Sequence, residues 1–312
     1  MESKLLLVGA GNMAIDYAHV LNHLEQSFDT VCRTQKSANN FTEKTSKPCM
    51  IGGLDGISEF SRYEMAIIAT PVLSIFDCAK TLIENGVTYL LIEKPGGIDE
   101  AQIAELNRIS SKHNSKVFIA YNRRFYQSVQ EAKKIIQEDG GGYTAQFDFT
   151  EWSHVIEGID MPDELKKNWF LANSTHVVDL AFYLIGKPTE LSAYQSGSLS
   201  WHKPSKFSGS GITDKNILFH YGANWESAGR WGLEITTAYR KLIFCPLEEL
   251  KSQDKGTIAI MNVENIDYSK DKSYKAGIYE QTKAFLNREQ GTLKPLEEQV
   301  NDFKFYNKIL GK

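Results

Sequence analysis

Cysteine, excess positive charge and long apolar runs are scarce in this sequence, and each scarcity excludes a class of protein. The four cysteines form no C-x-x-C pair and no zinc-type spacing, so we expect reduced thiols and no metal site. The formal net charge of -4 gives no overall basic field for nucleic acid or an anionic membrane. The cysteines are Cys32, Cys49, Cys78 and Cys245.

Membrane-spanning and secretory segments are also missing from the pattern. No stretch approaches the ~20 apolar residues that a transmembrane helix needs. The apolar run Leu5 to Val8 is too short for a signal-peptide core. With 42% hydrophobic and 24% charged residues over 312 positions, the composition is typical of a globular protein of about two domains. We therefore expect a cytoplasmic protein with no membrane partner.

The first part of the chain alternates strand-like and helix-like segments. This alternation predicts a parallel sheet with helices on both faces. The expected strands cover residues 4–8, 28–32, 64–69, 88–92 and 117–120. The expected helices follow Gly11, run from Thr70 to about Asn85, and run from an N-cap at Asp99 to about His113.

The pattern changes after residue 125 to one typical of an α+β domain with a mostly antiparallel sheet. Residues 143–152 alternate as a half-buried strand does. Further strands are expected near 190–201, 216–222, 231–238 and 240–245, and helices over 126–138, 174–185, 276–290 and 294–310. We place the two domains at 1–121 and 122–312, and the last helix is a candidate to pack back on the first domain.

The turn after the first strand predicts dinucleotide binding. Gly9-Ala10-Gly11-Asn12-Met13-Ala14 matches G-x-G-x-x-G/A between a strand and a helix. Gly9 permits the tight turn, Gly11 permits close approach of a pyrophosphate, and the following helix N-terminus favours anions. The alternative is a helix-packing turn that binds no ligand.

The end of the second strand favours NADP(H) over NAD(H). NAD-binding proteins usually carry an acid there, against the ribose 2′-hydroxyl. This chain instead has Arg33-Thr34-Gln35-Lys36-Ser37. Arg33 can stack on adenine and pair with a 2′-phosphate, and Thr34 can add a hydrogen bond. NAD(H) stays possible, since these residues can also form a solvated basic loop.

Lys94 is the expected catalytic group. Glu93-Lys94-Pro95 ends a predicted parallel strand, and ligands in such sheets bind outside those ends. A lysine there can donate or accept a proton if its pKa is lowered. Taken alone, this tripeptide is better explained as a surface lysine before a turn.

Several motifs together resemble the glucose–fructose oxidoreductase, inositol dehydrogenase and rhizopine catabolism (Gfo/Idh/MocA) family. They are the glycine turn, Ala69-Thr70-Pro71, Glu93-Lys94-Pro95 and Tyr121-Asn122-Arg123-Arg124-Phe125, in the family's order. The resemblance implies a Rossmann domain, then an open-faced α/β domain, with a sugar, cyclitol or nucleotide-linked sugar as substrate. It adds Ala69, Thr70, Pro71, Glu93 and Asn122 to the expected cofactor contacts.

The same resemblance implies a histidine in a D-x-G-x-H-x-x-D segment. The matching stretch, residues 172–179, keeps His176 and Asp179 but has Ala172 and Ser174 at the first aspartate and the glycine. His176 is therefore expected to assist Lys94, and Asn173 to bind substrate in place of the lost carboxylate. Asp179, three residues on, is expected to orient the imidazole.

The remaining substrate candidates are basic or aromatic. Arg123 and Arg124 can hold a phosphate or carboxylate, although at least one is expected to form an ion pair between the two domains. Trp152 and Trp169 can stack on a sugar ring or serve as packing residues. Tyr279 begins a helix that the resemblance puts near the pocket.

The sequence as a whole predicts an NADP(H)-dependent oxidoreductase acting on an alcohol or ketone of a sugar-like molecule. The alternatives are a nucleotide-sensing regulator of the same fold, or a reductase of an imine or non-sugar ketone. We also expect a homo-oligomer, dimer or tetramer, because alternating strands leave one sheet face needing cover.

Overall fold

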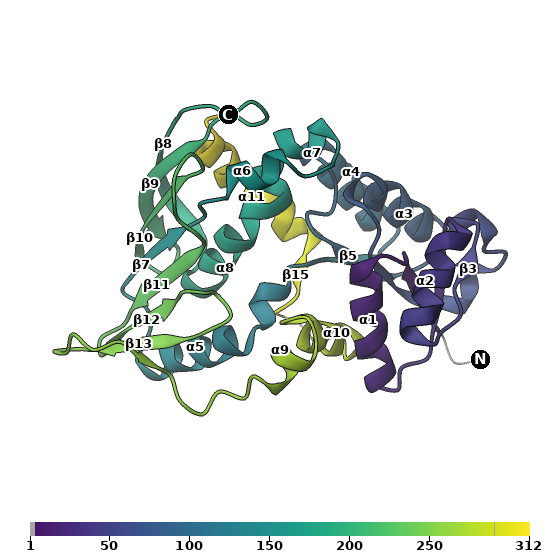
Figure 1. Cartoon of the computed structure of the whole chain (residues 1–312), viewed down its shortest axis with the longest axis horizontal. Coiled ribbons are helices and arrows are strands. Elements are labelled where there is room, and N and C mark those ends of the chain that lie inside the picture. Colours follow the sequence, from purple (N-terminus) through teal and green to yellow (C-terminus); the bar gives the residue numbers. More distant parts are fainter. Residues whose placement is uncertain (1–3, 290) are drawn as a thin grey trace. The chain divides into compact units, whose positions relative to one another are not determined.

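The computed structural model describes residues 4–289 and 291–312, which form two compact units (Figure 1). The first comprises Met1–Asn122 and Lys270–Asn301, and the second comprises Arg123–Ser269 and Asp302–Lys312. Each unit is therefore assembled from two separate stretches of sequence. Two helices contain a point where the chain passes between units: α9 (Ser269–Ser273) and α11 (Leu296–Leu310).

A seven-stranded sheet forms the centre of the first unit. Its order is β15-β6-β5-β4-β1-β2-β3, with β1 to β6 parallel and β15 antiparallel to β6. Central strand residues are fully buried because both faces of a parallel sheet are covered. The strands are β1 (Lys4–Val8), β2 (Phe28–Cys32), β3 (Met50–Ile51), β4 (Tyr63–Ile68), β5 (Tyr89–Glu93), β6 (Lys116–Ala120) and β15 (Lys294–Pro295).

The helices of this unit follow the strands in a doubly wound pattern. The chain moves outward from β1 to β3, then returns to β4 on the other side of β1. This reversal between β1 and β4 is the topological switch point, where such sheets bind ligands. The helices are α1 (Asn12–His23), α2 (Gln35–Thr45), α3 (Val72–Glu84), α4 (Glu100–Lys112) and α10 (Ile278–Leu286), with short 3-10 turns at Gly53–Gly56 and Phe60–Arg62.

The second unit contains an eight-stranded sheet in the order β14-β13-β12-β11-β7-β10-β9-β8. Only β7 and β10 pair in parallel among its described neighbours; the other pairs are antiparallel. The strands are β7 (Thr144–Asp148), β8 (Pro188–Ser196), β9 (Lys206–Thr213), β10 (Leu218–Asn224), β11 (Gly232–Thr236), β12 (Arg240–Phe244), β13 (Lys251–Asp254) and β14 (Met261–Asn262).

Helix α8 packs an apolar face against this second sheet. The Phe182 ring meets Phe147 of β7 and Phe219 of β10 edge-on, with centroids 5.6 and 5.1 Å away. The helices of the unit are α5 (Gln127–Glu138), α6 (Ser153–Glu157), α7 (Asp163–Lys167) and α8 (Thr175–Ile185); a 3-10 turn covers Asn122–Phe125 and a π-helical turn Phe170–Ser174. The predicted fold class, a parallel sheet followed by a mostly antiparallel one, is confirmed.

Several predicted boundaries are wrong for local reasons. The strand expected over 143–152 ends at Asp148, whose side chain accepts the Thr150 backbone N–H at 2.6 Å and turns the chain. The strand expected over 190–201 ends at Ser196, before Gly197 with φ +72°. The helix expected over 276–290 is Ile278–Leu286, and the one expected from 294 begins at Leu296 because 294–295 pair with β6.

Two elements that the sequence did not predict are rich in polar or small residues. Helix α2 has few apolar positions, and β9 reads KFSGSGIT. The β9 glycines are required by packing. A Cβ on Gly209 would lie 2.4 Å from the Tyr221 ring, and one on Gly211 would lie 2.0 Å from the Glu190 carbonyl oxygen. Intrinsic strand propensity therefore fails to predict β9, because side chains of the neighbouring strands cover its glycines.

Candidate functional site

A cavity of about 840 Å³ lies in the first unit, at the carboxyl ends of β1, β2, β4 and β5. Its wall includes every residue expected to bind the cofactor except Asn122: Gly9, Gly11, Asn12, Met13, Arg33, Thr34, Ala69, Thr70, Pro71, Glu93 and Lys94. These residues come from four separate segments of the sequence, and the fold brings them to one cavity as predicted. Asn122 is buried instead, and its Nδ2 donates to the Ala276 carbonyl oxygen at 2.8 Å.

Gly9 makes the turn after β1 possible. Its φ is +119°, and a Cβ there would lie 2.4 Å from the carbonyl oxygen of Ala69, at the end of β4. A side chain would therefore push apart the two strand ends that flank the switch point. Only glycine satisfies both the backbone angle and the close approach.

Gly11 has a different role, at the N-terminus of α1. A Cβ there would meet no atom within 4 Å, so it would project into open space beside the helix end. No side chain caps α1, and its first turn carries no acid. The first N–H groups and the positive end of the helix dipole are thus suited to an anion. These features fit the pyrophosphate of a dinucleotide.

Arg33 and Thr34 border the cavity at the end of β2. The Thr34 hydroxyl caps α2 by accepting the Ser37 backbone N–H at 3.2 Å. Arg33 is exposed, and no carboxylate within residues 4–289 and 291–312 forms an ion pair with it. Two acids that the sequence did not predict here, Asp55 and Asp77, also line this cavity.

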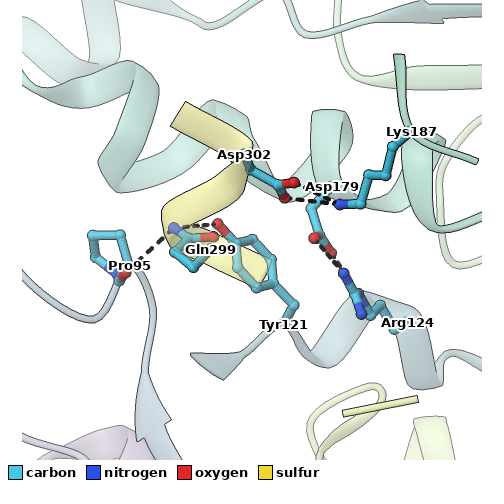
Figure 2. Close-up of polar contacts among 7 residues, drawn as sticks. All are labelled: Pro95, Tyr121, Arg124, Asp179, Lys187, Gln299 and Asp302. Carbon is cyan, nitrogen blue, oxygen red and sulfur yellow. Dashed lines mark hydrogen bonds and ion pairs between the residues drawn. The ribbon is translucent and has the colours of Figure 1, made fainter. Parts of the chain in front are cut away.

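Lys94 lies on the cavity wall just after β5, and the peptide bond to Pro95 is cis. Gln299 holds this loop from behind: its Nε2 lies 3.4 Å from the Pro95 carbonyl oxygen and 3.2 Å from the Tyr121 hydroxyl (Figure 2). A Cβ on Gly96 would lie 2.6 Å from Ile119 Cδ1, so the loop lies directly on β6. The backbone that carries Lys94 is therefore fixed from two sides.

Glu93 is held by a buried hydrogen-bond chain. The Tyr17 hydroxyl of α1 donates to its Oε1 at 2.8 Å. With the Gln281 amide turned to satisfy its neighbours, Gln281 donates to Tyr17 and accepts backbone N–H groups of Tyr121 and Asn122 at 3.3 and 3.1 Å. Burial raises the pKa of the Glu93 carboxyl, opposed by the Tyr17 hydrogen bond and by Lys94.

In the second unit, His176 and Asn173 lie at the start of α8. His176 is buried in the first turn, with its ring 6.2 Å from that of Trp231. Asn173 Nδ2 donates to both oxygens of Glu151, at 3.0 and 3.1 Å, and the Ser174 hydroxyl donates to Glu151 at 2.8 Å. The Asn173 amide N–H₂ is thus used inside the protein rather than directed only at a ligand.

Glu151, Arg230 and Trp231 are residues that motif reasoning missed. Glu151 follows β7, its side chain is 2% exposed, and its carboxylate lies 3.5 Å from Arg230 Nη1. The Arg230 guanidinium lies over the rings of both Trp152 and Trp231, 4.9 and 4.5 Å from their centroids. Arg123 lies 4.8 Å from the Trp231 ring. The one available signal was that Glu151 falls within the alternating run predicted over residues 143–152.

Arg124 and Asp179 form an ion pair within the second unit, whereas an ion pair between the domains was expected for at least one of the two arginines. Arg124 Nε and Nη2 donate to the two Asp179 oxygens at 2.8 and 2.7 Å, with both side chains buried (Figure 2). Asp179 is therefore used by the guanidinium, where we expected it to orient His176. A buried guanidinium needs such a partner. Lys187 and Asp302 form a second pair of this unit at 2.8 Å.

Trp169 and Tyr279 lie in aromatic clusters. The Trp169 ring meets Trp201 edge-on at 6.2 Å in the second unit. Tyr279, in the first unit, is buried against His23 and Tyr274, with centroids 5.5 and 5.1 Å away. These contacts match the packing alternative that we kept open for the tryptophan.

Comparison with known proteins agrees with this architecture. Residues 3–121 match the model of an oxidoreductase family with an NAD-binding Rossmann fold, Gfo/Idh/MocA. A comparison with curated protein sequences finds no match. None of the helices in the described part of the chain is both long and apolar enough to cross a lipid bilayer.

Solved structures share the fold over the whole chain. An oxidoreductase from Agrobacterium radiobacter, in complex with NAD+, L-tartaric acid and magnesium, is 14% identical with a TM-score of 0.75, covering 100% of this chain and 98% of its own. Levoglucosan dehydrogenase with NADH and levoglucosan is 15% identical with a TM-score of 0.76, covering 99% and 96%.

A third structure is the WlbA dehydrogenase from Chromobacterium violaceum with NADH and UDP-GlcNAcA. It is 16% identical with a TM-score of 0.71, covering 99% of this chain and 93% of its own. At these identities the likeness establishes the fold. Together with the family match, it confirms the resemblance predicted from the motifs: residues 3–121 resemble the NAD-binding Rossmann domain of the Gfo/Idh/MocA oxidoreductase family, and the whole chain shares the fold of these solved structures.

Proposed function

We propose that the chain catalyses reversible hydride transfer between NADP(H) and a secondary alcohol or ketone of a sugar derivative. The observation that carries this proposal is the cavity wall of the first unit. It combines an uncapped helix N-terminus at Gly11 with an amine, Lys94, at the end of β5. The first binds a pyrophosphate, and the second can exchange a proton with a hydroxyl.

The residues of the chain have separate tasks in this proposal. The bound nicotinamide supplies or accepts the hydride. Gly9 and Gly11 allow the backbone of the turn to hold the phosphates. Lys94 takes the proton from the alcohol oxygen in oxidation and returns it in reduction, and His176 assists by holding that hydroxyl. The fixed loop behind Lys94 keeps its backbone in place, which favours a defined reaction geometry.

Replacing Lys94 with Met tests this assignment. We expect hydride transfer to fall by about 10²- to 10⁴-fold, the usual contribution of a positioned acid–base group. Cofactor affinity should stay within about threefold, since a single uncharged stem replaces the amine at one end of the cavity. Full turnover in this variant would remove Lys94 from the mechanism. If the wild type binds the cofactor but transfers no hydride with any sugar of a broad panel, that result would instead support a nucleotide sensor.

The preference for NADP(H) rests on Arg33. Its guanidinium has no carboxylate partner in the part of the chain described, so it is open to a 2′-phosphate. The structural neighbours named above contain NAD+ or NADH, and Asp55 and Asp77 line the same cavity. Replacing Arg33 tests the preference. We expect Arg33→Met to weaken the binding of NADPH by about 10-fold or more and the binding of NADH much less. Equal losses would favour NAD(H).

The sugar class of the substrate is supported by the neighbours, whose complexes hold levoglucosan in one case and UDP-GlcNAcA in another. Reduction of an imine or a non-sugar ketone would show as turnover with those compounds and none with sugars.

We also propose a homo-oligomer, through the face of the second sheet that carries the exposed side chains Tyr194 and Leu218. Light scattering on the purified protein would test it, and a monomer at all concentrations would contradict it.

A further inference from the structure

The arginine–tryptophan stack of the second unit contains an unused hydrogen-bonding edge. Arg230 precedes β11, and its guanidinium carbon lies 4.9 Å from the centroid of the Trp152 ring and 4.5 Å from that of Trp231. Trp152 is itself fixed, because its Nε1 donates to the Gly229 carbonyl oxygen at 2.9 Å. Glu151 lies 3.5 Å from Nη1. The three contacts with Trp152, Trp231 and Glu151 restrict a side chain that is otherwise flexible.

The remaining edge of this guanidinium is its Nε–Nη2 side. Three other arginines of the chain use that side to hold a carboxylate: Arg108 with Glu105, Arg124 with Asp179 and Arg240 with Asp139. Within residues 4–289 and 291–312, no acceptor bonds to the same side of Arg230.

The unused edge is also accessible. The Arg230 side chain is 47% exposed, and the Trp152 ring beside it is 48% exposed. Aromatic rings contact a guanidinium through its face, whereas hydrogen bonds form in its plane, so the contacts with the indoles leave the edge open. An oxyanion with two oxygens, a carboxylate or a phosphate, is the group that fits such a fork.

From these observations we infer that Arg230 binds an anionic group of the substrate, so that the substrate is a sugar bearing a carboxylate or a phosphate. This inference rests on the proposed function for its use in catalysis. Trp152 offers the adjoining apolar surface to the sugar ring. Glu151 is then a positioning residue: it holds Arg230 at Nη1 while binding Asn173 and Ser174 ahead of His176.

The experiment compares matched ligands on matched variants. Glucuronate, glucose 1-phosphate and glucose are titrated calorimetrically into the protein saturated with NADP+, and hydride transfer is followed by absorbance of the reduced nicotinamide. The variants are Arg230→Lys, which keeps the charge but loses the fork, and Arg230→Met, which loses both. Arg108→Met is the control, since it removes an exposed arginine of α4 that is paired with Glu105.

We expect wild type to bind one of the two anionic sugars at least about 10-fold more tightly than glucose, and the better one identifies the oxyanion. Arg230→Met should lose about 10- to 100-fold for that ligand and little for glucose, with Arg230→Lys between them. Arg108→Met should match wild type. Tryptophan fluorescence of each variant checks that the stack has kept its fold.

Two outcomes separate this inference from the proposed function. If Arg230-dependent binding of the anionic sugar occurs without hydride transfer, the anion site stands and the proposed activity fails. If hydride transfer occurs but the Arg230 substitutions change the affinity for all three sugars equally, the anion site is overturned and the activity stands.

Discussion

Replacing Arg124 with Met should lower the free energy of unfolding of the second unit strongly and should change ligand binding little. Two charge-assisted hydrogen bonds, of 2.8 and 2.7 Å, join Arg124 to Asp179, with side-chain exposures of 2% and 1%. Removing one partner of such a pair leaves a buried charge and typically costs about 3–5 kcal/mol. The double variant R124M/D179L should recover much of that loss, because both charges are then gone.

The chain offers a matched control and a selective probe for this prediction. Arg240 pairs with Asp139 through the same two nitrogens, at 3.0 and 3.2 Å, but is 35% exposed, so Arg240→Met should cost less than half as much. The five tryptophans all belong to the second unit, so their fluorescence during urea unfolding reports that unit.

The alternative reading of Arg124 gives the opposite result. If Arg124 holds substrate, Arg124→Met would raise KM and leave the urea midpoint unchanged. A midpoint equal to that of wild type would refute the stability argument, whatever happened to KM. NADPH affinity serves as the internal control, because the residues proposed to bind it belong to the first unit.

Three further predictions concern single side chains. Gly11→Ala should fold normally yet weaken cofactor binding, whereas Gly9→Ala should destabilise the first unit by about 1–3 kcal/mol or more through its φ of +119°; calorimetry and thermal unfolding separate the two. Burial lowers the pKa of His202 from 6.5 to about 4, so its folded form binds fewer protons than its unfolded form. The resulting stabilisation is complete above pH 6.5 and is lost as pH falls towards 4, by up to about 3 kcal/mol; His202→Gln should flatten that loss in tryptophan-monitored unfolding. Tyr17→Phe removes the donor to Glu93 and should destabilise the first unit by about 1–3 kcal/mol, measured by circular dichroism on heating; an unchanged melting temperature would contradict it.

The cofactor side of the site could be predicted because its residues are neighbours of strand ends. Once Gly9, Arg33, Thr70 and Lys94 are each placed after a parallel strand, the topology brings them to one edge of the sheet. Asp55, from a short turn with no motif, and Asp77, from α3, also line the cavity and were not predicted. Local sequence signals are sufficient for this part of the site because the sheet topology brings the strand ends together.

The second unit was less predictable because its contacts join distant segments. Helical spacing alone suggested that Asp179 would serve His176, yet the buried guanidinium of Arg124, 55 residues away in sequence, takes both of its oxygens. Likewise, Glu151 and Arg230 meet only because β7 pairs with β11. Neither partner could be chosen without the sheet register, which no short motif encodes.

The division of each unit into two stretches has a consequence for how the protein is made. When residues 1–122 have emerged from the ribosome, every parallel strand of the first sheet has been made, but β15 and α10 have not. Until those arrive, the edge of β6 lacks its neighbour and Tyr89 lacks the Phe285 ring that stacks on it at 5.0 Å. Completion of the Rossmann unit therefore waits for nearly the whole chain, and a truncated gene product ending near residue 270 should be a target for chaperones and proteases.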